Sequence, residues 1–475
     1  MISPSLHPGP VRAVCERRRR WSFGLTGRSI GLLTAGFLLL VPGFWLSGLS
    51  YAMLVWDALV LLGALLDGLR MPAVGQLSAT RTWSSAPALD GETEIELTVE
   101  NQGRTVVHCR MVDDLPPALV ADPQTYRLTA FPRVPARLRY HVEPQERGDC
   151  ETGWLYVRYR SPLGLAERWA MARLTQTVRV YPALRTTGEQ QIFLARSRQI
   201  DLQLRQARQR GLGRDFESLR EYREGDDLRD ICWTATARRG NLITRQYQTE
   251  RSQPVWIVLD CGRLMRSRVA GPAGTGNGSR DPAAGPRVHS KLDHACSAAV
   301  ALAQLALYSG DRVGLLAYGQ GIQQRLLPGR GSDHLRQLIE LLAQVRSEPS
   351  EADHLRATTV LNRLQPRRSL ILWVTDLAET AMRPEVIDGA VQLLRRHVLL
   401  FVAMAQPEVE LIARTRPKNV EQMFRSAAAQ EMAGRRELLL ARLHEQGALT
   451  LDLNPEALTS TVLNQYLTVK ERAMV

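Results

Sequence analysis

The chain has 475 residues, which is too long for one ordinary hydrophobic core and predicts two or three domains. Lysine and arginine total 61 against 48 aspartates and glutamates, so the formal net charge is +13. A basic chain can bind nucleic acid or lie beside an anionic membrane. Only 6% of the residues are aromatic, and no segment interleaves them with basic residues, which argues against a platform for single-stranded nucleic acid.

The six cysteines are dispersed along the chain. None forms a CxxC motif or a cluster with histidine, which argues against a zinc site. This usage fits a reducing compartment without a disulfide framework, and a single Cys109–Cys150 bridge is the alternative.

Residues 29–68 are predicted to form two transmembrane helices. No charged residue occurs between Arg28 and Asp57, and the apolar run continues to Leu66. One helix of this length would be roughly 57 Å long, nearly twice the roughly 30 Å hydrocarbon core of a bilayer. Two short helices that reverse near Ser47–Ser50 fit better.

The flanking charges predict the orientation of this hairpin. Arg17–Arg20 precede the first helix, and Arg70 and Arg81 follow the second. Positive residues stay on the cytoplasmic side, so residues 1–28 and the bulk of the chain are predicted to be cytoplasmic, with two passes through the inner (cell) membrane. The alternative is a cleaved signal peptide, which the second apolar run disfavours.

Asp57 lies inside the second predicted helix. The interpretation we favour is an acid near the outer interface that reaches headgroup water, because it is some two turns from the proposed reversal. The alternative is a polar contact to the partner helix or to another protein.

Residues 75–183 are predicted to form a β-sandwich. Apolar and polar residues alternate in Thr93–Glu100, Leu138–Val142 and Leu155–Tyr159. Such alternation over short runs is typical of half-buried strands, and turn signals such as Asp90-Gly91 separate them. Several short strands at this spacing favour an immunoglobulin-like sandwich.

A helical linker is predicted over residues 184–212, followed by a segment of dense mixed charge from Gly213 to Asp260. Interleaved arginines and acids favour an ion-pair network over a nucleic-acid surface. Asp226 and Asp227 are good helix-start residues. Four residues then fall on one face at helical spacing: Leu228, Ile231, Cys232 and Ala235.

The rest of the chain alternates strands with helices. Strands are predicted at Val255–Leu259, Arg312–Tyr318, Gln323–Leu327, Ser369–Thr375, Val398–Ala405 and Ala448–Leu453. Helices are predicted at Leu292–Tyr308, Asp333–Val345, Ala352–Leu364, Glu385–Arg396, Val420–Glu445 and Pro455–Val469. The alternation predicts a mainly parallel sheet with helices on both faces, whose ligands bind at the carboxyl ends of the strands.

This layout resembles the family known as domain of unknown function 58. The residues that carry the resemblance are Gly213, Phe216, Leu219-Arg220, Tyr222, Gly225-Asp226, Arg229, Ile231, Trp233 and Ala237-Arg238. The resemblance implies a von Willebrand A-like domain within residues 213–475 and a MoxR-type AAA+ ATPase as partner. The expected interaction or family-motif residues are Arg220, Tyr222, Gly225, Asp226, Arg229, Trp233 and Arg238. The alternative is that these charged residues only tie the short helix to the edge of the domain.

A von Willebrand A fold often carries a metal-ion-dependent adhesion site, marked DxSxS after its first strand. Here Asp260, Gly262 and Leu264 match that motif, so both serines are missing, while Thr358 and Asp376 match the later ligands. Mg²⁺ prefers near-octahedral oxygen ligands. With three candidate ligands left, we expect a degenerate metal site and no cofactor.

The segment 268–290 is Gly/Pro-rich and predicted to be a mobile insertion. It contains no GK[ST] motif, so it is not a phosphate loop. No nucleophile–base–acid set stands out in the chain, and the nine histidines show no metal-ligand spacing. We therefore expect that the protein is not an enzyme.

These features predict a membrane-anchored, chaperone-like adaptor for protein–protein interaction. It would work with the ATPase that the resemblance implies, in assembly or maturation of other proteins, with the lipid bilayer as its second partner and no nucleic acid. A metal-dependent ligand-binding or adhesion module is one alternative, and a hydrolase is a second.

Overall fold

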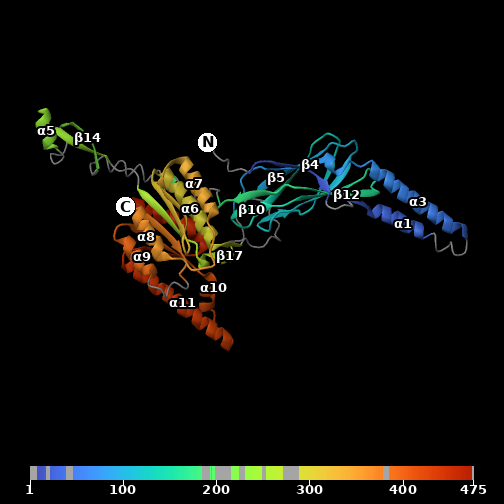
Figure 1. Cartoon of the computed structure of the whole chain (residues 1–475). Helices are drawn as coiled ribbons and strands as arrows, with labels where there is room; N and C mark the ends of the chain where they lie inside the picture. Colours follow the sequence, from blue (N-terminus) through green and yellow to red (C-terminus); the bar gives the residue numbers. More distant parts are fainter. Residues whose placement is uncertain are drawn as a thin grey trace. The chain divides into compact units, whose positions relative to one another are not determined.

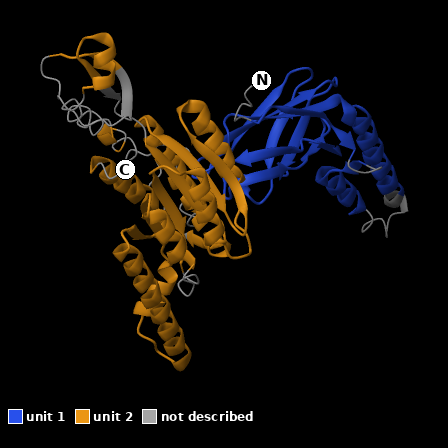
Figure 2. Ribbon diagram, turned by 60° about the vertical axis from the view of Figure 1, so that its left-hand side comes forward, with its two compact units in different colours: residues 1–183 blue, residues 184–475 orange. Residues whose placement is uncertain are grey.

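A computed structural model describes most of the chain: residues 8–17, 22–38, 47–183, 193, 195–197, 215–223, 231–248, 253–270, 288–377 and 385–472. It divides into two compact units, residues 1–183 and 184–475 (Figures 1 and 2). The boundary coincides with the predicted end of the β domain. The predicted helical linker, residues 184–212, lies almost entirely outside the described residues.

The first unit is built on two antiparallel sheets. One sheet has the order β1 (Val11–Val14), β4 (Leu77–Trp83), β5 (Thr93–Asn101), β9 (Ala136–Pro144) and β7 (Leu119–Asp122). The other has the order β2 (Glu16–Arg17), β12 (Ala166–Ala172), β11 (Leu155–Arg160), β6 (Val107–Asp113) and β8 (Tyr126–Ala130), with β3 (Phe23–Leu25) also paired to β12. A separate ribbon joins β10 (Gly148–Thr152) to β13 (Gln176–Val180).

Buried apolar side chains from both sheets form one core. Leu97 on β5 belongs to it together with Met111 on β6 and Val157 on β11. The strands that alternation predicted are therefore confirmed, while the immunoglobulin-like topology stays a prediction. Cys109 and Cys150 are not joined by a disulfide, and the Cys150 thiol donates to the Val178 carbonyl at 3.3 Å.

The N-terminal residues also belong to these sheets. Strand β1 pairs with β4, placing Val11 opposite Arg81, and β2 and β3 pair with β12. The assignment of residues 1–28 to a basic segment outside the β domain is therefore wrong for its described part. The three strands have only two to four residues each, too few for a periodic pattern to reveal them.

Two helices, α1 (Gly27–Phe37) and α3 (Ser47–Leu69), contact each other beside the sheets. The Trp56 indole on α3 donates to the Leu32 carbonyl on α1 at 3.0 Å. Among the described residues one span, Tyr51–Gln76, is long and apolar enough to cross a membrane. Helix α1 has 11 residues, or about 17 Å, and would not cross alone.

Asp57 faces the neighbouring helix. A Cβ built on Gly36 of α1 would lie 2.6 Å from Asp57 Oδ1, and this oxygen is buried with no hydrogen-bond partner within the described part of the chain. Asp57 thus lies against the partner helix without a hydrogen bond from this oxygen, and the interpretation that it reaches headgroup water stays a prediction.

A buried aspartate joins the helices to the sheets. Asp67, near the end of α3, accepts hydrogen bonds from the Ser161 hydroxyl and from the backbone N–H of Leu165 (3.2 Å). At the start of α1, the Thr26 hydroxyl donates to the Gly164 carbonyl at 2.5 Å. The turn between β11 and β12 is thus fixed to one end of both helices.

The second unit contains a six-stranded sheet. Its order is β20 (Ile322–Gly329), β19 (Arg312–Tyr318), β16 (Pro254–Asp260), β21 (Leu370–Thr375), β22 (Val398–Met404) and β23 (Leu449–Leu453). All neighbours are parallel except β19 and the edge strand β20. The predicted mainly parallel sheet is confirmed by this strand order.

Helices cover both faces of this sheet. The apolar core on one face includes side chains of α8 (His354–Leu364), α9 (Glu385–Leu394) and α11 (Val420–Glu445). Helix α6 (Lys291–Tyr308) lies against β16 and β19, and α12 (Leu458–Glu471) and α7 (Gly331–Gln344) pack on α6. The helix α10 (Pro407–Arg414), which the sequence analysis missed, packs on α11.

The segment of mixed charge forms a ribbon and a short helix. Strands β14 (Asp215–Glu221) and β15 (Ile243–Gln248) are antiparallel, and α5 (Trp233–Arg239) lies between them in sequence. Helix α5 begins at Trp233, while the predicted helix-start residues Asp226 and Asp227 lie outside the described residues. Ile231 and Cys232 therefore precede the helix, where they are buried.

The ends of the predicted insertion pair with each other. Strands β17 (Arg268–Ala270) and β18 (Val288–Ser290) form an antiparallel ribbon, which corrects the prediction of a mobile segment at these ends. Residues 271–287 lie outside the described part of the chain.

Candidate functional site

The carboxyl edge of the parallel sheet brings two aspartates together. Asp260 is the last residue of β16, and Asp376 directly follows the neighbouring parallel strand β21. Parallel strands end at the same edge of a sheet, which is where ligands of such sheets bind. Both side chains are almost fully buried, with exposures of 4% for Asp260 and 1% for Asp376.

Asp260 is held by two hydrogen bonds. Its Oδ1 accepts from the Gly262 backbone N–H at 2.7 Å, and its Oδ2 accepts from the Thr375 hydroxyl at 2.6 Å. Burial raises the pKa of Asp260 to about 6, although both hydrogen bonds act in the opposite direction. This carboxyl therefore takes up a proton in mildly acidic solution.

Asp376 forms a buried ion pair with a lysine. Lys291 is the first residue of α6 and is 1% exposed, and its Nζ lies 2.6 Å from Asp376 Oδ2. The positive end of the helix dipole disfavours a cation at this position, so Asp376 must offset both that repulsion and the loss of water. Burial lowers the pKa of Lys291, and the carboxylate of Asp376 opposes this shift.

The backbone around Lys291 is set by a capping box. The Ser290 hydroxyl accepts from the Asp293 N–H at 3.1 Å, and the Asp293 carboxylate accepts from the Ser290 N–H at 3.1 Å. The Lys291 N–H donates to the Ser267 carbonyl at 2.9 Å. These contacts fix the start of α6 and direct the lysine to the sheet edge.

A second cation and an amide complete the surroundings of Asp376. Arg436 of α11 approaches Asp376 Oδ1 at 3.6 Å and pairs with Asp452 at 2.6 Å. The Gln406 amide lies 3.2 Å from Asp376 Oδ2. Lys291 and Arg436 thus place two positive charges around the Asp376 carboxylate.

The three predicted metal ligands each have hydrogen-bond partners within the protein. Asp260 and Asp376 share the edge, but the Thr358 hydroxyl donates to the Leu355 carbonyl within α8 at 2.9 Å. The ammonium of Lys291 binds the carboxylate of Asp376, which Mg²⁺ would need as an oxygen ligand. The residues at this edge therefore do not fit a magnesium ion.

A hollow of about 420 Å³ opens beside Arg436, between α10 and α11. Its lining includes Gln406 and Asp452 from the sheet edge and apolar side chains such as Val409, Met432 and Leu440. The hollow therefore links the charged edge to an apolar surface on the two helices.

The start of α11 exposes apolar side chains. Val420, Met423 and Phe424 are 66%, 53% and 68% exposed. Their i, i+3, i+4 spacing places them on one side of the helix, and we call them the α11 apolar face. On α10, which packs on α11, Leu411 is 69% exposed. Figures 1 and 2 show α11 reaching beyond the sheet.

The family-motif residues lie apart from the α11 apolar face in sequence. Tyr222 follows β14, and its N–H donates to the Leu242 carbonyl at 2.9 Å, while the Arg220 guanidinium donates to the Glu221 carbonyl at 3.2 Å. Arg238 is exposed, and Trp233 is 67% exposed. The remaining predicted motif residues, Gly225, Asp226 and Arg229, lie outside the described residues.

The fold and the edge define an α/β domain whose strand-end carboxylate is neutralised by the protein's own lysine. Residues 218–414 match the family model described as "Protein of unknown function DUF58". This is the family that the chain's motif residues resemble, and the match covers less than half of the chain.

Curated relatives are mycobacterial. "Uncharacterized protein Rv1480" of Mycobacterium tuberculosis (strain ATCC 25618 / H37Rv) is 26% identical over 206 residues, which cover 42% of this chain. The same figures hold for "Uncharacterized protein Mb1516" of Mycobacterium bovis (strain ATCC BAA-935 / AF2122/97). The match spans 58% of the length of these relatives.

Solved structures show more distant likeness. The "conserved hypothetical protein BatB from Bacteroides thetaiotaomicron" is 14% identical, with 46% of this chain and 100% of that chain covered and a TM-score of 0.28. The "SpRpn10 VWA domain" is 12% identical, with 45% and 95% covered and a TM-score of 0.23. The "Uncharacterized Membrane Spanning Protein from Vibrio fischeri" is 12% identical, with 45% and 96% covered and a TM-score of 0.17. At these TM-scores the likenesses carry no argument, and the description of the fold rests on the strand order.

The buried ion pair predicts a non-additive effect on stability. Lys291→Met leaves the Asp376 carboxylate buried without its nearest cation, and we expect it to lower the free energy of unfolding of the α/β unit by about 3 kcal/mol. Lys291→Met combined with Asp376→Asn should recover most of that loss. Urea unfolding of the full chain measures both effects, with exposed Lys418→Met as the control. Equal losses in the single and double variants would contradict the pairing.

The pKa of Asp260 predicts how stability depends on pH. Folding raises this pKa from 3.8 to about 6, so between these values the folded chain binds a proton that the unfolded chain has lost. The resulting stabilisation is present at low pH and disappears as the pH rises through 6. Between about pH 4.5 and about pH 7.5 we expect the wild type to lose about 2 kcal/mol of unfolding free energy relative to Asp260→Asn. If the free energy of unfolding, measured in urea, changes with pH in the same way for both proteins, this prediction is wrong.

Proposed function

We propose that this protein is a membrane-anchored adaptor for protein–protein interaction, working with a MoxR-type AAA+ ATPase in the assembly or maturation of other proteins. It carries out no chemical reaction itself and binds no nucleic acid. The bilayer holds the first unit, and the α/β unit presents the docking surface. The α11 apolar face is the observation that carries this proposal, and the family resemblance supplies the class of partner.

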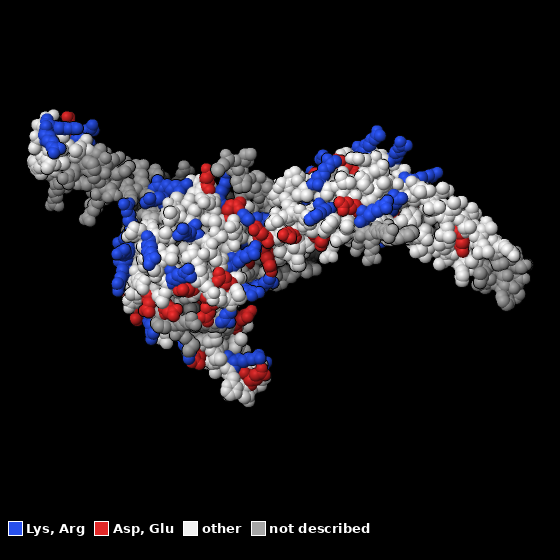
Figure 3. Space-filling model, viewed as in Figure 1, with Lys and Arg blue, Asp and Glu red and all other residues white. Residues whose placement is uncertain are grey.

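The surface of α3 supports the anchor. Its exposed apolar side chains include Leu54, Val55, Leu59, Leu62 and Leu66. Figure 3 shows this helix as an almost uncharged surface. Exposing so many large apolar side chains to water is costly, and lipid tails would cover them.

The two-pass topology rests on the ends of both helices. Arg28 stands at the start of α1 and Arg70 directly follows α3, and both ends contact the same turn of the β domain. Basic residues favour the cytoplasmic side. We therefore propose that residues 29–68 cross the inner membrane twice, with the bulk of the chain in the cytoplasm.

The α11 apolar face has the composition of a protein-binding surface. Large apolar side chains such as Phe424 and Met423 are typical of interface centres, and the hollow further along α11, from Met432 on, offers space for a partner side chain. A metal-dependent adhesion module is disfavoured because Lys291 occupies the carboxylate that a metal would need.

This proposal predicts that the full-length protein, solubilised in detergent, co-purifies with an AAA+ ATPase identified by mass spectrometry. Phe424→Asp places a charge in the centre of the α11 apolar face, and we expect it to reduce recovery of the ATPase at least about tenfold. The experiment is run with and without a non-hydrolysable ATP analogue, since such ATPases change shape with nucleotide.

A matched control is available on another surface of the same unit. Leu327 on the edge strand β20 is 58% exposed, and Leu327→Asp should leave recovery of the ATPase unchanged. The proposal fails if no AAA+ ATPase is enriched under either nucleotide condition. The assignment of the α11 apolar face fails if Phe424→Asp and Leu327→Asp behave alike.

A further inference from the structure

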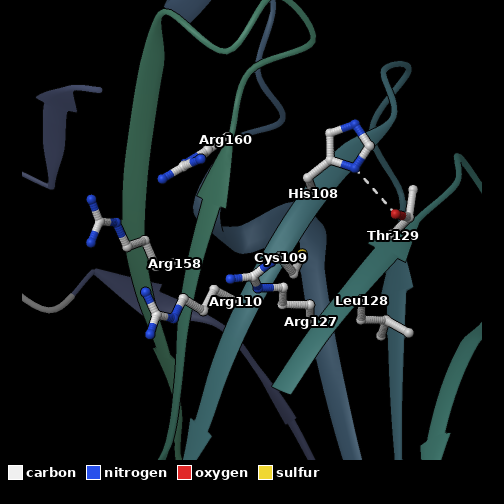
Figure 4. A pocket seen from close by; sticks show the side chains of 8 residues that line it. All are labelled: His108, Cys109, Arg110, Arg127, Leu128, Thr129, Arg158 and Arg160. Carbon is white, nitrogen blue, oxygen red and sulfur yellow. Dashed lines mark hydrogen bonds between the residues drawn. The ribbon is translucent and has the colours of Figure 1, made fainter. Parts of the chain in front are cut away.

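Four arginines line a hollow on the outer face of the six-stranded sheet of the first unit. Arg110 on β6, Arg127 on β8, and Arg158 and Arg160 on β11 surround a volume of about 370 Å³ (Figure 4). His108 and Thr129 complete the polar part of the lining. We call this set the arginine hollow.

The strand register stacks these charges side by side. Arg110 lies directly opposite Arg127 on one neighbouring strand and opposite Arg158 on the other, so the three form one row across the sheet. Directly opposite Cβ atoms are about 5 Å apart, and like charges in such pairs repel. The fold therefore tolerates a repulsion that an anion would relieve.

Little of this charge is neutralised internally. Arg158 binds Glu167 of β12 through two of its nitrogens, at 2.9 Å and 2.6 Å. No acidic side chain lines the hollow, and no acidic partner for Arg110 or Arg127 occurs within the described ranges. Four guanidinium groups against one carboxylate leave three positive charges.

The donors suit a phosphate group. A guanidinium group offers parallel N–H donors that match two oxygens of a phosphate, and Arg110, Arg127 and Arg158 present such groups from adjacent strands. The His108 Nδ1 lies 3.1 Å from the Thr129 hydroxyl, which holds the imidazole beside them. The hollow thus fits an anion that bears a phosphate.

The hollow begins at the membrane end of the sheet. Arg160 is followed by the 161–165 turn, which is bonded to Asp67 at the end of α3 and to Thr26 at the start of α1. Arg158 is two residues further along β11, or about 7 Å. The headgroup zone of a bilayer is roughly 5–8 Å thick on each side, so both arginines are within its reach.

We propose that the arginine hollow binds the phosphate of an anionic phospholipid headgroup at the surface of the membrane that α3 crosses. This inference rests on the proposed membrane anchor, but not on the proposed ATPase partner. The bound lipid neutralises the row of arginines and fixes the β domain against the bilayer.

The test uses the full-length protein in nanodiscs that contain phosphatidylcholine with or without phosphatidylglycerol. Native mass spectrometry after release counts the phosphatidylglycerol molecules that stay bound. We expect the wild type to retain phosphatidylglycerol in preference to phosphatidylcholine. Arg110→Gln combined with Arg127→Gln should weaken that retention about tenfold, because each arginine beside an anionic lipid surface contributes to the binding free energy.

The control removes two arginines from the outer face of the opposite sheet. Arg137 and Arg139 on β9 are exposed and pair with Glu96, and Arg137→Gln with Arg139→Gln should retain phosphatidylglycerol like the wild type. Equal retention by both double variants would overturn the proposal. A wild type that shows no lipid preference but binds inorganic phosphate in detergent, with loss in the Arg110/Arg127 variant, would also overturn the lipid assignment and identify a soluble phosphate as the ligand.

Membrane fractionation separates this inference from the proposed function. Both double variants should remain in the membrane fraction, because α3 provides the anchor. Recovery of the wild type in the soluble fraction would overturn the anchor and, with it, the lipid assignment. Loss of lipid retention in the Arg110/Arg127 variant with unchanged ATPase recovery would support the arginine hollow independently of the docking surface.

Discussion

The buried contact between Lys291 and Asp376 determines what the α/β unit can do. The two groups lie 2.6 Å apart at the carboxyl edge of a parallel sheet, where such folds usually bind ligands. An ammonium group bonded to the strand-end carboxylate neutralises the edge from within. Asp260 beside it takes hydrogen bonds from Thr375 and Gly262, so both carboxylates already have protein partners.

Because the carboxylates at this edge already have protein partners, we place the docking surface on the helices around it. Arg436 connects Asp376 to Asp452 and also lines the hollow between α10 and α11. The α11 apolar face lies further along the same helix. A partner that docks there would be bound by apolar contacts on a helix that also carries Arg436 of the sheet edge. Such an arrangement suits an adaptor that needs no metal ion to engage its partner.

The first unit has its own organising contact. Asp67 ties α3 to the turn between β11 and β12, and Thr26 ties α1 to the same turn. Arg160 directly precedes that turn. The ends of α1 and α3 and the arginine hollow therefore lie at the same end of the sheet. The proposed membrane anchor and the proposed lipid site are therefore parts of one arrangement rather than independent features.

Much of this fold could be predicted from the sequence, for identifiable reasons. Strands such as Val398–Met404 are continuous buried runs, and Val420–Glu445 is a long helix with a clear N-cap at Asn419. The residues before α5 were predicted to be helical, but Ile231 forms an isolated bridge to Thr244 and Cys232 is the N-cap of α5, because the pairing depends on β15, which follows later in the chain. The strand β1 was missed because pairing with β4, a distant part of the chain, creates it.

The site was predicted only in part. Strand ends identified Asp260 and Asp376, and the missing serines led us to expect a degenerate metal site. Lys291 was overlooked, although the sequence held a signal: it follows Ser290 inside a capping box, where a cation opposes the helix dipole. That Lys291 is buried and paired with Asp376 depends on the three-dimensional arrangement of α6 and β21.

Titration calorimetry of the full-length protein with MgCl₂ tests the central claim most directly. If Lys291 supplies the positive charge at the sheet edge, the wild type shows no saturable heat, and Asp376→Asn gives the same flat titration. Saturable binding of one Mg²⁺ by the wild type that Asp376→Asn abolishes would contradict it.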